Sequence, residues 1–273
     1  MKILITGCKG YVARNLYKLL PQYNFTLTDH KLLDITDQRA TDIFFENKYF
    51  DAVIHTAVSG GKRTQKDDSS CLYENLLMHN NLMRNKNHFG KIIHFGSGAE
   101  FDRSSNIDNN STLEESLPND PYGLSKNIIA KTTLNENQFY NVRVYNVFNY
   151  DELETRMIKS NIIKYINKEP MKIHQNKVMD FFFMDDLSQI VQFIIEDKIK
   201  DNHINCCYKN HQTLFDIAQY INSLSNYKVS IDVEDESMGT SYFGQYNIPE
   251  NIETKGLFFG IKDSYEKILE EYK

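Results

Sequence analysis

The chain has 273 residues and a formal net charge of −6 at pH 7, a length sufficient for one large α/β domain or for a domain with an additional lobe. The acidic balance, without a run of Lys and Arg interleaved with aromatic residues, argues against a nucleic acid as partner. The four cysteines lack the spacing of a metal site, and no apolar run reaches the ~18 residues that a membrane span needs. We therefore expect reduced thiols, no metal, no membrane segment and a cytoplasmic location.

Short β-branched runs alternate with amphipathic segments along the first half of the chain. The runs are predicted strands, and the segments between them have helical spacing. This alternation is typical of a doubly wound parallel sheet with helices on both faces, the Rossmann type of α/β fold. The predicted strands are 2–7, 25–29, 52–58, 91–97 and 142–148, and the predicted helices are 11–20, 37–48, 70–85 and 124–136.

The pattern changes after residue 150. Helices are predicted at 156–169 and 213–225, and a strand running into a helix at 178–197. We expect residues 1–150 to form the dinucleotide-binding body. Residues 151–273 are expected to form mainly a small C-terminal substrate-binding lobe, with some elements returning to the body.

A glycine-rich turn, T-G-C-K-G-Y-V-A, follows the first predicted strand and opens the first predicted helix. Gly7 and Gly10 permit a tight turn and close backbone approach, and a helix N-terminus is suited to a pyrophosphate. Ala13, at the third position, still permits close packing of the helix on the strand. The turn predicts dinucleotide binding, with a purely structural turn as the alternative.

The residues near the expected adenosine site give conflicting indications of whether the cofactor is NAD or NADP. Lys9 lies inside the turn, where its ammonium would reach an adenosine 2′-phosphate, and His30 with the lysine after it also favours NADP. Asp29, at the end of the second strand, would accept from a ribose 2′-OH and favours NAD. Asp34 has two interpretations: it accepts from the adenine amino group, or it caps the helix expected to start near residue 37.

The motifs in their order resemble those of extended short-chain dehydrogenases/reductases of the NAD-dependent epimerase/dehydratase family, which act on nucleotide sugars. Within that family the chain is most similar to the GDP-fucose synthase-like sugar 4-reductases, with which it shares the layout of 32–45, 55–62 and 72–83. The motifs are T-G-x-x-G at 6–10, L-L-D at 32–34, H-T-A at 55–57, Ser97, Tyr122-x-x-x-Lys126 and F-F-M-D-D-L at 182–187.

The resemblance implies NADPH as the cofactor, with NADH as the second choice, and a nucleotide sugar as the substrate. It also implies a homodimer built on helices within 72–83 and 124–134, although burial inside one chain explains their apolar faces equally well. The residues implied to bind the cofactor are Gly7, Lys9, Gly10, Tyr11, Val12, His30, Asp34, Ile35 and Ala57.

Ser97, Tyr122 and Lys126 form a pattern suited to proton donation. Hydride addition to a ketone builds negative charge on the oxygen, so the site needs a donor that is acidic enough near neutral pH. A phenol has an unperturbed pKa of about 10, and a lysine four residues later lies on the same helix face, where its charge stabilises the phenolate. The resemblance implies Tyr122 as the acid, Lys126 as its tuner and Ser97 as the group that hydrogen-bonds the carbonyl. A structural tyrosine is the alternative.

Two small residues follow Ser97 where related enzymes carry catalytic groups. The family's dehydratases have an Asp-Glu pair at the positions of Gly98 and Ala99, and its epimerising reductases have a Cys at Ala99 and a His within the segment matching 145–156, which here has none. Glu100 comes one position later and is expected, by strand alternation, to point to the opposite face. We therefore expect reduction at C4 without dehydration or epimerisation.

The substrate side departs from the family at Met179, where relatives have an arginine that binds the diphosphate. Two buried phosphate charges need partners, and Arg156 is the first candidate, before Lys177 and Arg143. The resemblance implies Ala99, Asn146 and Arg156 as substrate-binding residues. Asp185 and Asp186 are expected to cap a helix that begins at Leu187.

The leading hypothesis is therefore an NADPH-dependent reductase of a nucleotide-linked 4-keto-6-deoxy sugar, GDP-linked and a hexose or heptose, for surface glycan synthesis. A 4-epimerase that retains NAD is the second hypothesis, supported by Asp29 and opposed by Lys9. A non-catalytic dinucleotide sensor is the third, and the presence of Ser97, Tyr122 and Lys126 speaks against it.

Overall fold

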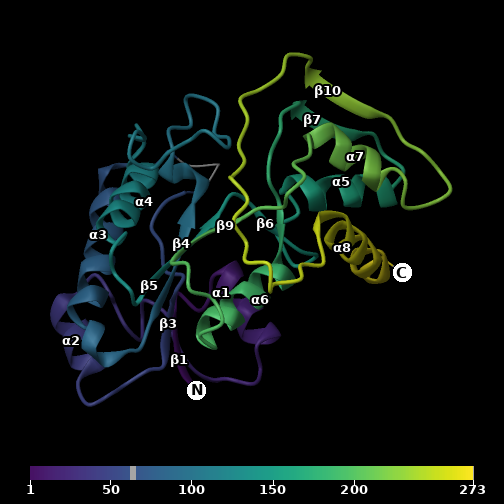
Figure 1. Cartoon of the computed structure of the whole chain (residues 1–273). Helices are drawn as coiled ribbons and strands as arrows, with labels where there is room; N and C mark the ends of the chain where they lie inside the picture. Colours follow the sequence, from purple (N-terminus) through teal and green to yellow (C-terminus); the bar gives the residue numbers. More distant parts are fainter. Residues whose placement is uncertain (62–65, 273) are drawn as a thin grey trace. The chain divides into compact units, whose positions relative to one another are not determined.

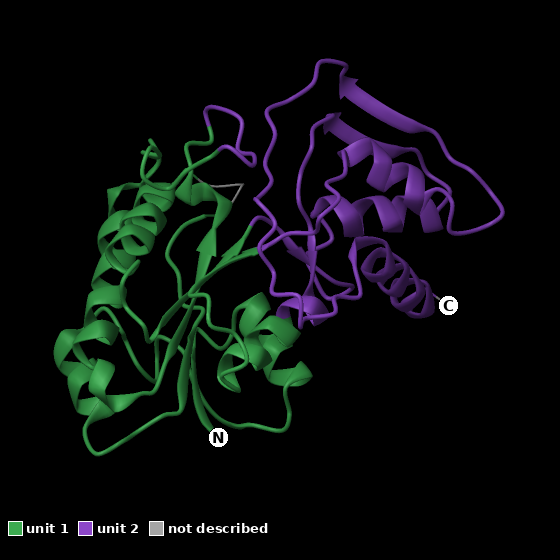
Figure 2. Cartoon of the chain, viewed as in Figure 1, with its two compact units in different colours: residues 1–103, 111–144, 188–205 green, residues 104–110, 145–187, 206–273 purple. Residues whose placement is uncertain are grey.

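The computed structural model describes residues 1–61 and 66–272. The chain forms two compact units that are interleaved along the sequence (Figure 2). Unit 1 comprises 1–103, 111–144 and 188–205, and unit 2 comprises 104–110, 145–187 and 206–273.

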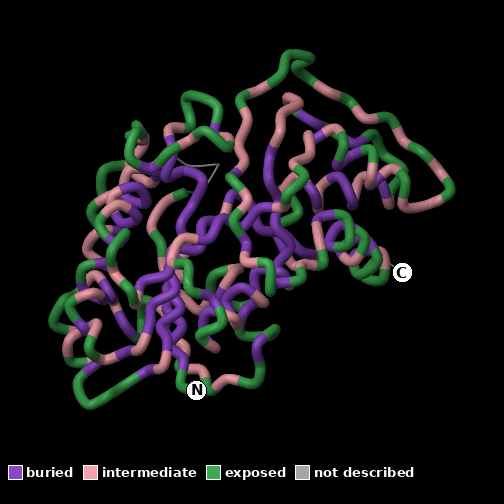
Figure 3. Tube along the Cα trace, viewed as in Figure 1, coloured by how far each residue is buried: buried purple, intermediate pink, exposed green. Residues whose placement is uncertain are grey.

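Unit 1 is built on a six-stranded sheet whose order is β2-β1-β3-β4-β5-β9, with parallel pairing from β1 to β5. Its central strands are buried on both faces (Figure 3), which is why they read as continuous apolar runs in the sequence. The strands are β1 (Lys2–Thr6), β2 (Asn24–Thr28), β3 (Ala52–His55), β4 (Ile92–Ser97), β5 (Phe139–Val144) and β9 (His203–Cys206).

Helices cover the two faces of this sheet: α2, α3 and α4 lie on one side, and α1 and α6 on the other (Figure 1). The predicted doubly wound α/β fold is confirmed by this arrangement. The helices are α1 (Tyr11–Leu19), α2 (Gln38–Phe45), α3 (Ser69–Arg84), α4 (Pro121–Thr132) and α6 (Met184–Ile195), with short 3₁₀ turns η1 (Lys86–His88) and η2 (Gly98–Glu100).

The prediction of a single strand at 142–148 is wrong, because this segment contributes to two strands that belong to two different sheets. In β5, Val144 pairs with Ser97, the last residue of β4. Beyond Ser97 the chain turns into η2, so the pairing of β5 with β4 ends there. The chain continues into β6 (Val147–Phe148), which pairs with β8 (Phe182–Phe183) in unit 2.

Unit 2 packs three helices against two small parallel sheets. Its core includes Tyr165, Phe183 and Met179, so the methionine that replaces the family's arginine is a core residue. The segment 102–112 is anchored by Ile107, which is buried and whose N–H donates to the Ser241 carbonyl. The remaining elements are α5 (Met157–Ile166), β7 (Met171–Gln175), α7 (Leu214–Ile221), β10 (Ile231–Asp235) and α8 (Leu257–Glu271).

The four cysteines are free thiols. Within the described ranges, every helix is either too short or too polar to cross a bilayer. Dimerisation through α3 and α4 stays a prediction.

Candidate active site

The glycine turn lies at the carboxyl end of β1, between β2 on one side and β3 on the other. Gly7 has a φ of +66°, and a Cβ there would lie 2.7 Å from the backbone nitrogen of Ala57, at the end of β3. Gly10 donates its N–H to the Gly7 carbonyl at 2.9 Å and caps α1, whose first residues are Tyr11 and Val12. A chain reversal beside a helix N-terminus at this crevice is the backbone geometry that a dinucleotide pyrophosphate needs.

Lys9 and Asp29, which favour different cofactors, form an ion pair with each other. The Asp29 carboxylate also accepts from the backbone N–H groups of Lys31 and Leu32, at 3.0 and 3.1 Å. The hydrogen bond from Lys9 is the main cause that holds the pKa of Asp29 below its ordinary value. Asp29 is therefore both the anchor of the turn after β2 and the partner of Lys9.

The other predicted adenosine contacts lie just after β2. Asp34 accepts from the N–H and hydroxyl of Thr36 at 3.0 and 2.6 Å, and the exposed His30 lies 3.5 Å from its carboxylate. The helix cap proposed for Asp34 is wrong, because Asp37 caps α2 by accepting from a backbone N–H at 2.9 Å. The Ile35 side chain is buried in the core.

Tyr122 and Lys126 lie on one face of α4, with the Lys126 Nζ 5.9 Å from the centre of the Tyr122 ring. Asp120 caps this helix, and Pro121 occupies its first turn, so α4 begins three residues before the predicted start at 124. Lys126 is 4% exposed, and its burial lowers the pKa of the ammonium to about 8, against an opposing effect of Glu100. The lysine is thus charged at neutral pH but loses its proton more readily than a surface lysine.

Ser97 lies at the end of β4, next to the start of α4. Its hydroxyl accepts from the Ala99 N–H at 3.1 Å. A Cβ on Gly123 would lie 2.6 Å from the Ala99 carbonyl oxygen, so the turn after Ser97 packs directly on the first turn of α4. The structure therefore brings together the strand end that carries Ser97 and the helix that carries Tyr122 and Lys126.

A second set of contacts ties the loop after β3 to α4. Asn75 donates to the Ser125 hydroxyl at 3.1 Å, and Ser125 donates to the Tyr122 carbonyl at 2.7 Å. Asn75 also exchanges two hydrogen bonds with the Ser59 backbone. Gly61, with a φ of +73°, lies so close that a Cβ would be 2.8 Å from the Tyr122 ring. Lys62, the last residue of the family-like segment 55–62, lies outside the described residues.

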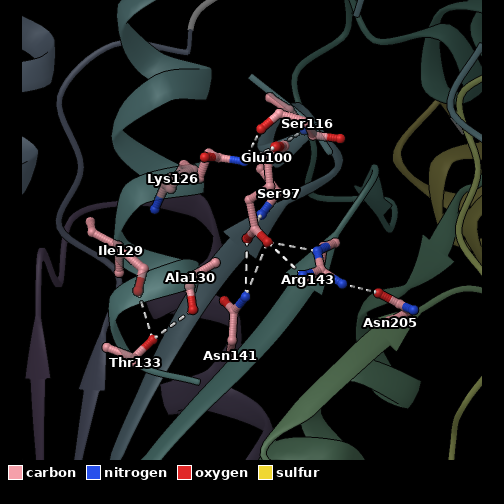
Figure 4. A network of polar contacts seen from close by, with 12 residues as sticks. Ser97, Glu100, Ser116, Lys126, Ile129, Ala130, Thr133, Asn141, Arg143 and Asn205 are labelled. Atoms are coloured by element: carbon pink, nitrogen blue, oxygen red, sulfur yellow. Dashed lines mark hydrogen bonds and ion pairs between the residues drawn. The ribbon is translucent and has the colours of Figure 1, made fainter. Parts of the chain in front are cut away.

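Glu100 lies in a buried polar network beneath Ser97 (Figure 4). Its carboxylate accepts from the Ser97 N–H at 3.0 Å and pairs with Arg143 at 2.6 Å, while Asn141 donates to both carboxylate oxygens. Arg143 also donates to Asn205 at 2.6 Å. The expected orientation of Glu100 by strand alternation is wrong, because residues 98–100 form η2 and the side chain folds back toward Ser97.

Arg143 is therefore not a candidate for binding the substrate diphosphate, because its guanidinium is buried in unit 1 and contacts Glu100 and Asn205. Ala99, predicted to bind substrate, has a buried side chain. In unit 2, Arg156 precedes α5 and lies 3.4 Å from the Asn146 amide oxygen and 3.5 Å from the Glu152 carboxylate. The two predicted substrate residues of unit 2 are therefore neighbours.

Two histidine contacts escaped the sequence analysis. His94 lies 3.3 Å from the Lys126 Nζ. His211 contacts the Asp180 carboxylate at 2.8 Å, and its ring lies tilted against Phe243 with 4.2 Å between centroids. Asn146 donates to the backbone carbonyl of the same Asp180. The available signal was a polar residue inside an apolar run, at His94 in I-I-H-F-G and at Asp180 in V-M-D-F-F.

Asp185 and Asp186 have a different structural role from the predicted one. The helix α6 begins at Met184, so neither caps a helix starting at Leu187. Asp186 accepts from the Tyr208 hydroxyl at 2.6 Å and from the Lys255 N–H at 2.7 Å. Asp185 pairs with the Lys255 ammonium at 2.8 Å, and both carboxylates hold the segment before α8.

The model of the NAD dependent epimerase/dehydratase family matches residues 3–207. The chain belongs to this family. Membership makes it an enzyme of the NAD(P)-dependent oxidoreductase class, as expected from the motifs. A search of curated proteins by sequence found no match.

Solved structures share the fold of this epimerase/dehydratase family member over nearly its whole length. A GDP-mannoheptose C4 reductase from Campylobacter jejuni with NADP bound has 19% identity and a TM-score of 0.77, covering 98% of each chain. A GDP-D-glycero-L-gluco-heptose synthase from the same organism, with NADPH, has 19% identity and a TM-score of 0.79, covering 100% of this chain and 98% of the other. A GDP-L-fucose synthetase from Naegleria fowleri bound to NADP has 16% identity and a TM-score of 0.75, with 99% and 93% covered. At these identities the likeness shows the fold.

Proposed function

We propose that the protein is an NADPH-dependent reductase of the C4 ketone of a nucleotide-linked 4-keto-6-deoxy sugar, acting without epimerisation at C3 or C5. One observation carries this proposal. Beside the turn after Ser97, α4 offers Tyr122 and Lys126 for proton donation, while the single carboxylate of that turn, Glu100, is fully buried and paired with Arg143. An enzyme that also dehydrated or epimerised would need a further acid or base beside the sugar.

The proposed chemistry uses three side chains. A dinucleotide held at the turn of Gly7, Lys9 and Gly10 would supply the hydride to C4. Tyr122 donates its phenolic proton to the oxygen on which charge develops, and the nearby ammonium of Lys126 stabilises the resulting phenolate. Ser97 donates a hydrogen bond to the same oxygen and keeps the carbonyl in line. The network of Glu100 holds the Ser97 backbone, so the hydroxyl is positioned before the substrate arrives.

The cofactor proposal rests on the fit of unit 1 to a dinucleotide. Gly7 and Gly10 permit a pyrophosphate to approach the start of α1, and Lys9 provides a cation near the end of β2, where a 2′-phosphate would lie. The solved relatives that hold NADP or NADPH support this choice. These proteins are named for GDP-linked heptoses and GDP-L-fucose, which supports a GDP-linked hexose or heptose as the substrate and surface glycan synthesis as the role.

The substrate diphosphate is proposed to lie against Arg156 in unit 2, oriented by Asn146. The Arg156 side chain is 32% exposed, and the guanidinium makes long contacts of 3.4 Å with Asn146 and 3.5 Å with Glu152. When a phosphate takes the place of the Asn146 amide oxygen, the guanidinium N–H groups can donate charge-assisted hydrogen bonds to it. Unit 2 is proposed as the substrate lobe on the same grounds.

The test incubates the enzyme with NADPH and a panel of GDP-linked 4-keto hexoses and heptoses in D₂O. Reduction at C4 consumes NADPH, and a non-epimerising enzyme leaves C3 and C5 without deuterium in the product. Deuterium at either carbon would overturn the absence of epimerisation. If no substrate causes NADPH to be consumed, and NAD is released when the protein is denatured, a 4-epimerase would be favoured instead.

A further inference from the structure

The ammonium of Lys126 is held by one carbonyl and one imidazole, both from β4. Its Nζ donates to the Phe95 carbonyl at 2.8 Å and lies 3.3 Å from Nε2 of His94. Both side chains are buried, at 4% and 2% exposure. An ammonium has three donors and no acceptor, so the imidazole nitrogen that faces it must be the acceptor. The proton of a neutral His94 is therefore on Nδ1.

The surroundings keep His94 neutral. Burial is the main cause that holds the pKa of His94 well below its ordinary value, and Lys126, His55 and His79 act in the same direction. Burial also lowers the pKa of His55 to about 3 and that of His79 to about 4. The groups that favour the charged form of Lys126 are Glu100 and Cys71. In the contact between the two side chains, Lys126 therefore carries the charge, and the neutral imidazole of His94 is the acceptor.

Folding alone does not account for an imidazole at this position. Nδ1 of His94 is buried and has no hydrogen-bond partner among the described residues, and one flank of the ring faces Phe139 at 5.5 Å between centroids. A buried donor without a partner destabilises the folded state, and an apolar side chain of similar shape is neutral or better. The contact with Lys126 is the interaction that favours a histidine here.

We propose that His94 is a positioning residue that fixes the Lys126 ammonium and sustains its charge by accepting a hydrogen bond from Nζ. This inference deepens the proposed reduction and rests on it for the role of Lys126 toward Tyr122. Removing the acceptor leaves the buried ammonium with the Phe95 carbonyl alone, so deprotonation becomes easier. Because only the charged form of Lys126 stabilises the phenolate of Tyr122, the alkaline limb of reduction then moves to lower pH.

The test measures the titration of Lys126 directly, by NMR of protein labelled with ¹³C at lysine Cε, with the resonance assigned by its loss in Lys126→Met. The variants are His94→Leu and His94→Met, which lack an acceptor, and His94→Gln, which retains one. His79→Leu is the matched control, since His79 is also buried, packs on Phe139 at 5.6 Å and has an unpartnered Nδ1. Thermal unfolding of each variant is recorded beside the titration.

The expected wild-type midpoint is about 8. It falls by about one to two pH units in His94→Leu and His94→Met, the effect of one lost hydrogen bond to a charged group, and stays within about half a unit in His94→Gln and His79→Leu. Both apolar variants remain folded and unfold cooperatively, but the lower Lys126 midpoint makes each less stable than wild type at neutral pH. An unchanged midpoint in either of them would overturn the proposal.

The two proposals fail separately. If no 4-keto sugar is reduced but the Lys126 midpoint still falls in His94→Leu, the reduction is wrong and the His94 contact stands. If wild-type enzyme reduces a substrate, and its alkaline limb and its Lys126 titration are both unchanged in His94→Leu, only the role of His94 is wrong.

Discussion

The carboxylate of Glu100 and the guanidinium of Arg143 form an ion pair inside unit 1, with Nε and Oε2 2.7 Å apart and side chains 0% and 8% exposed. A buried pair contributes little net stability, but removing one partner leaves the other charge uncompensated. We expect Glu100→Gln to lower the free energy of unfolding by about 3–5 kcal/mol. The double variant Glu100→Gln with Arg143→Met is expected to recover part of this loss, as measured by urea unfolding. Equal losses in the single and double variants would contradict the argument.

Position 7 requires a glycine because the backbone after β1 passes close to the backbone after β3. Gly7→Ala places a Cβ 2.7 Å from the Ala57 backbone nitrogen at a φ of +66°, so we expect a loss of about 1–3 kcal/mol of stability and the loss of NADPH binding. Gly256→Ala is the control, since Gly256 lies in unit 2 and also has a positive φ, of +95°, but a Cβ there would meet no heavy atom of the described residues within 4 Å. Calorimetric titration with NADPH checks both, and equal binding by the two variants would reject the role given to Gly7.

Lys9 is predicted to set the preference for NADPH. When a 2′-phosphate is present, the ammonium exchanges its ion pair with Asp29 for a contact with the phosphate. Lys9→Met is expected to weaken NADPH binding by about tenfold and NADH binding by less than about twofold. Lys18→Met removes the same charge from the last turn of α1 and is expected to leave the ratio of the two dissociation constants unchanged. The prediction fails if both lysine variants change this ratio equally.

Glu152 makes the stability of the fold dependent on pH. Burial raises the pKa of this carboxyl from 4.5 to about 7, with Arg156 opposing. Between these values the folded state binds more protons than the unfolded state, so the free energy of unfolding falls as pH rises through this window. We expect Glu152→Gln to be more stable than wild type at pH 8, by up to about 3 kcal/mol, and equal to it at about pH 4.

Urea unfolding at the two pH values measures this difference. Glu154→Gln, which removes an exposed carboxylate from the same loop, is the control and should shift neither value. A gain in Glu152→Gln of the same size at both pH values would show that the charge of Glu152 is not its cause.

The local features of the fold were predictable from the sequence because they depend on neighbouring residues. Apolar periodicity located β1 to β4 and α1 to α7 to within a few residues, and Gly7 marked the turn after β1. The family match confirms the resemblance read from the motif order. The sequence analysis missed β7, β10 and α8, although β7 and β10 alternate apolar and polar residues and α8 has an apolar face. Five alternating residues are too few to establish a strand without the neighbour that it pairs with.

The alternation of strands and helices, the glycine turn and the shared helix face of Tyr122 and Lys126 could be read from the amino-acid order, since all of these follow from backbone geometry over a few residues. The partners of the buried charges could not, because they depend on tertiary packing. Glu100 meets Arg143 across 43 residues, and Lys126 meets His94 across 32. Pairing of this kind depends on which strands lie side by side and where each one ends. That is a property of the packed sheet and is not encoded in any local pattern.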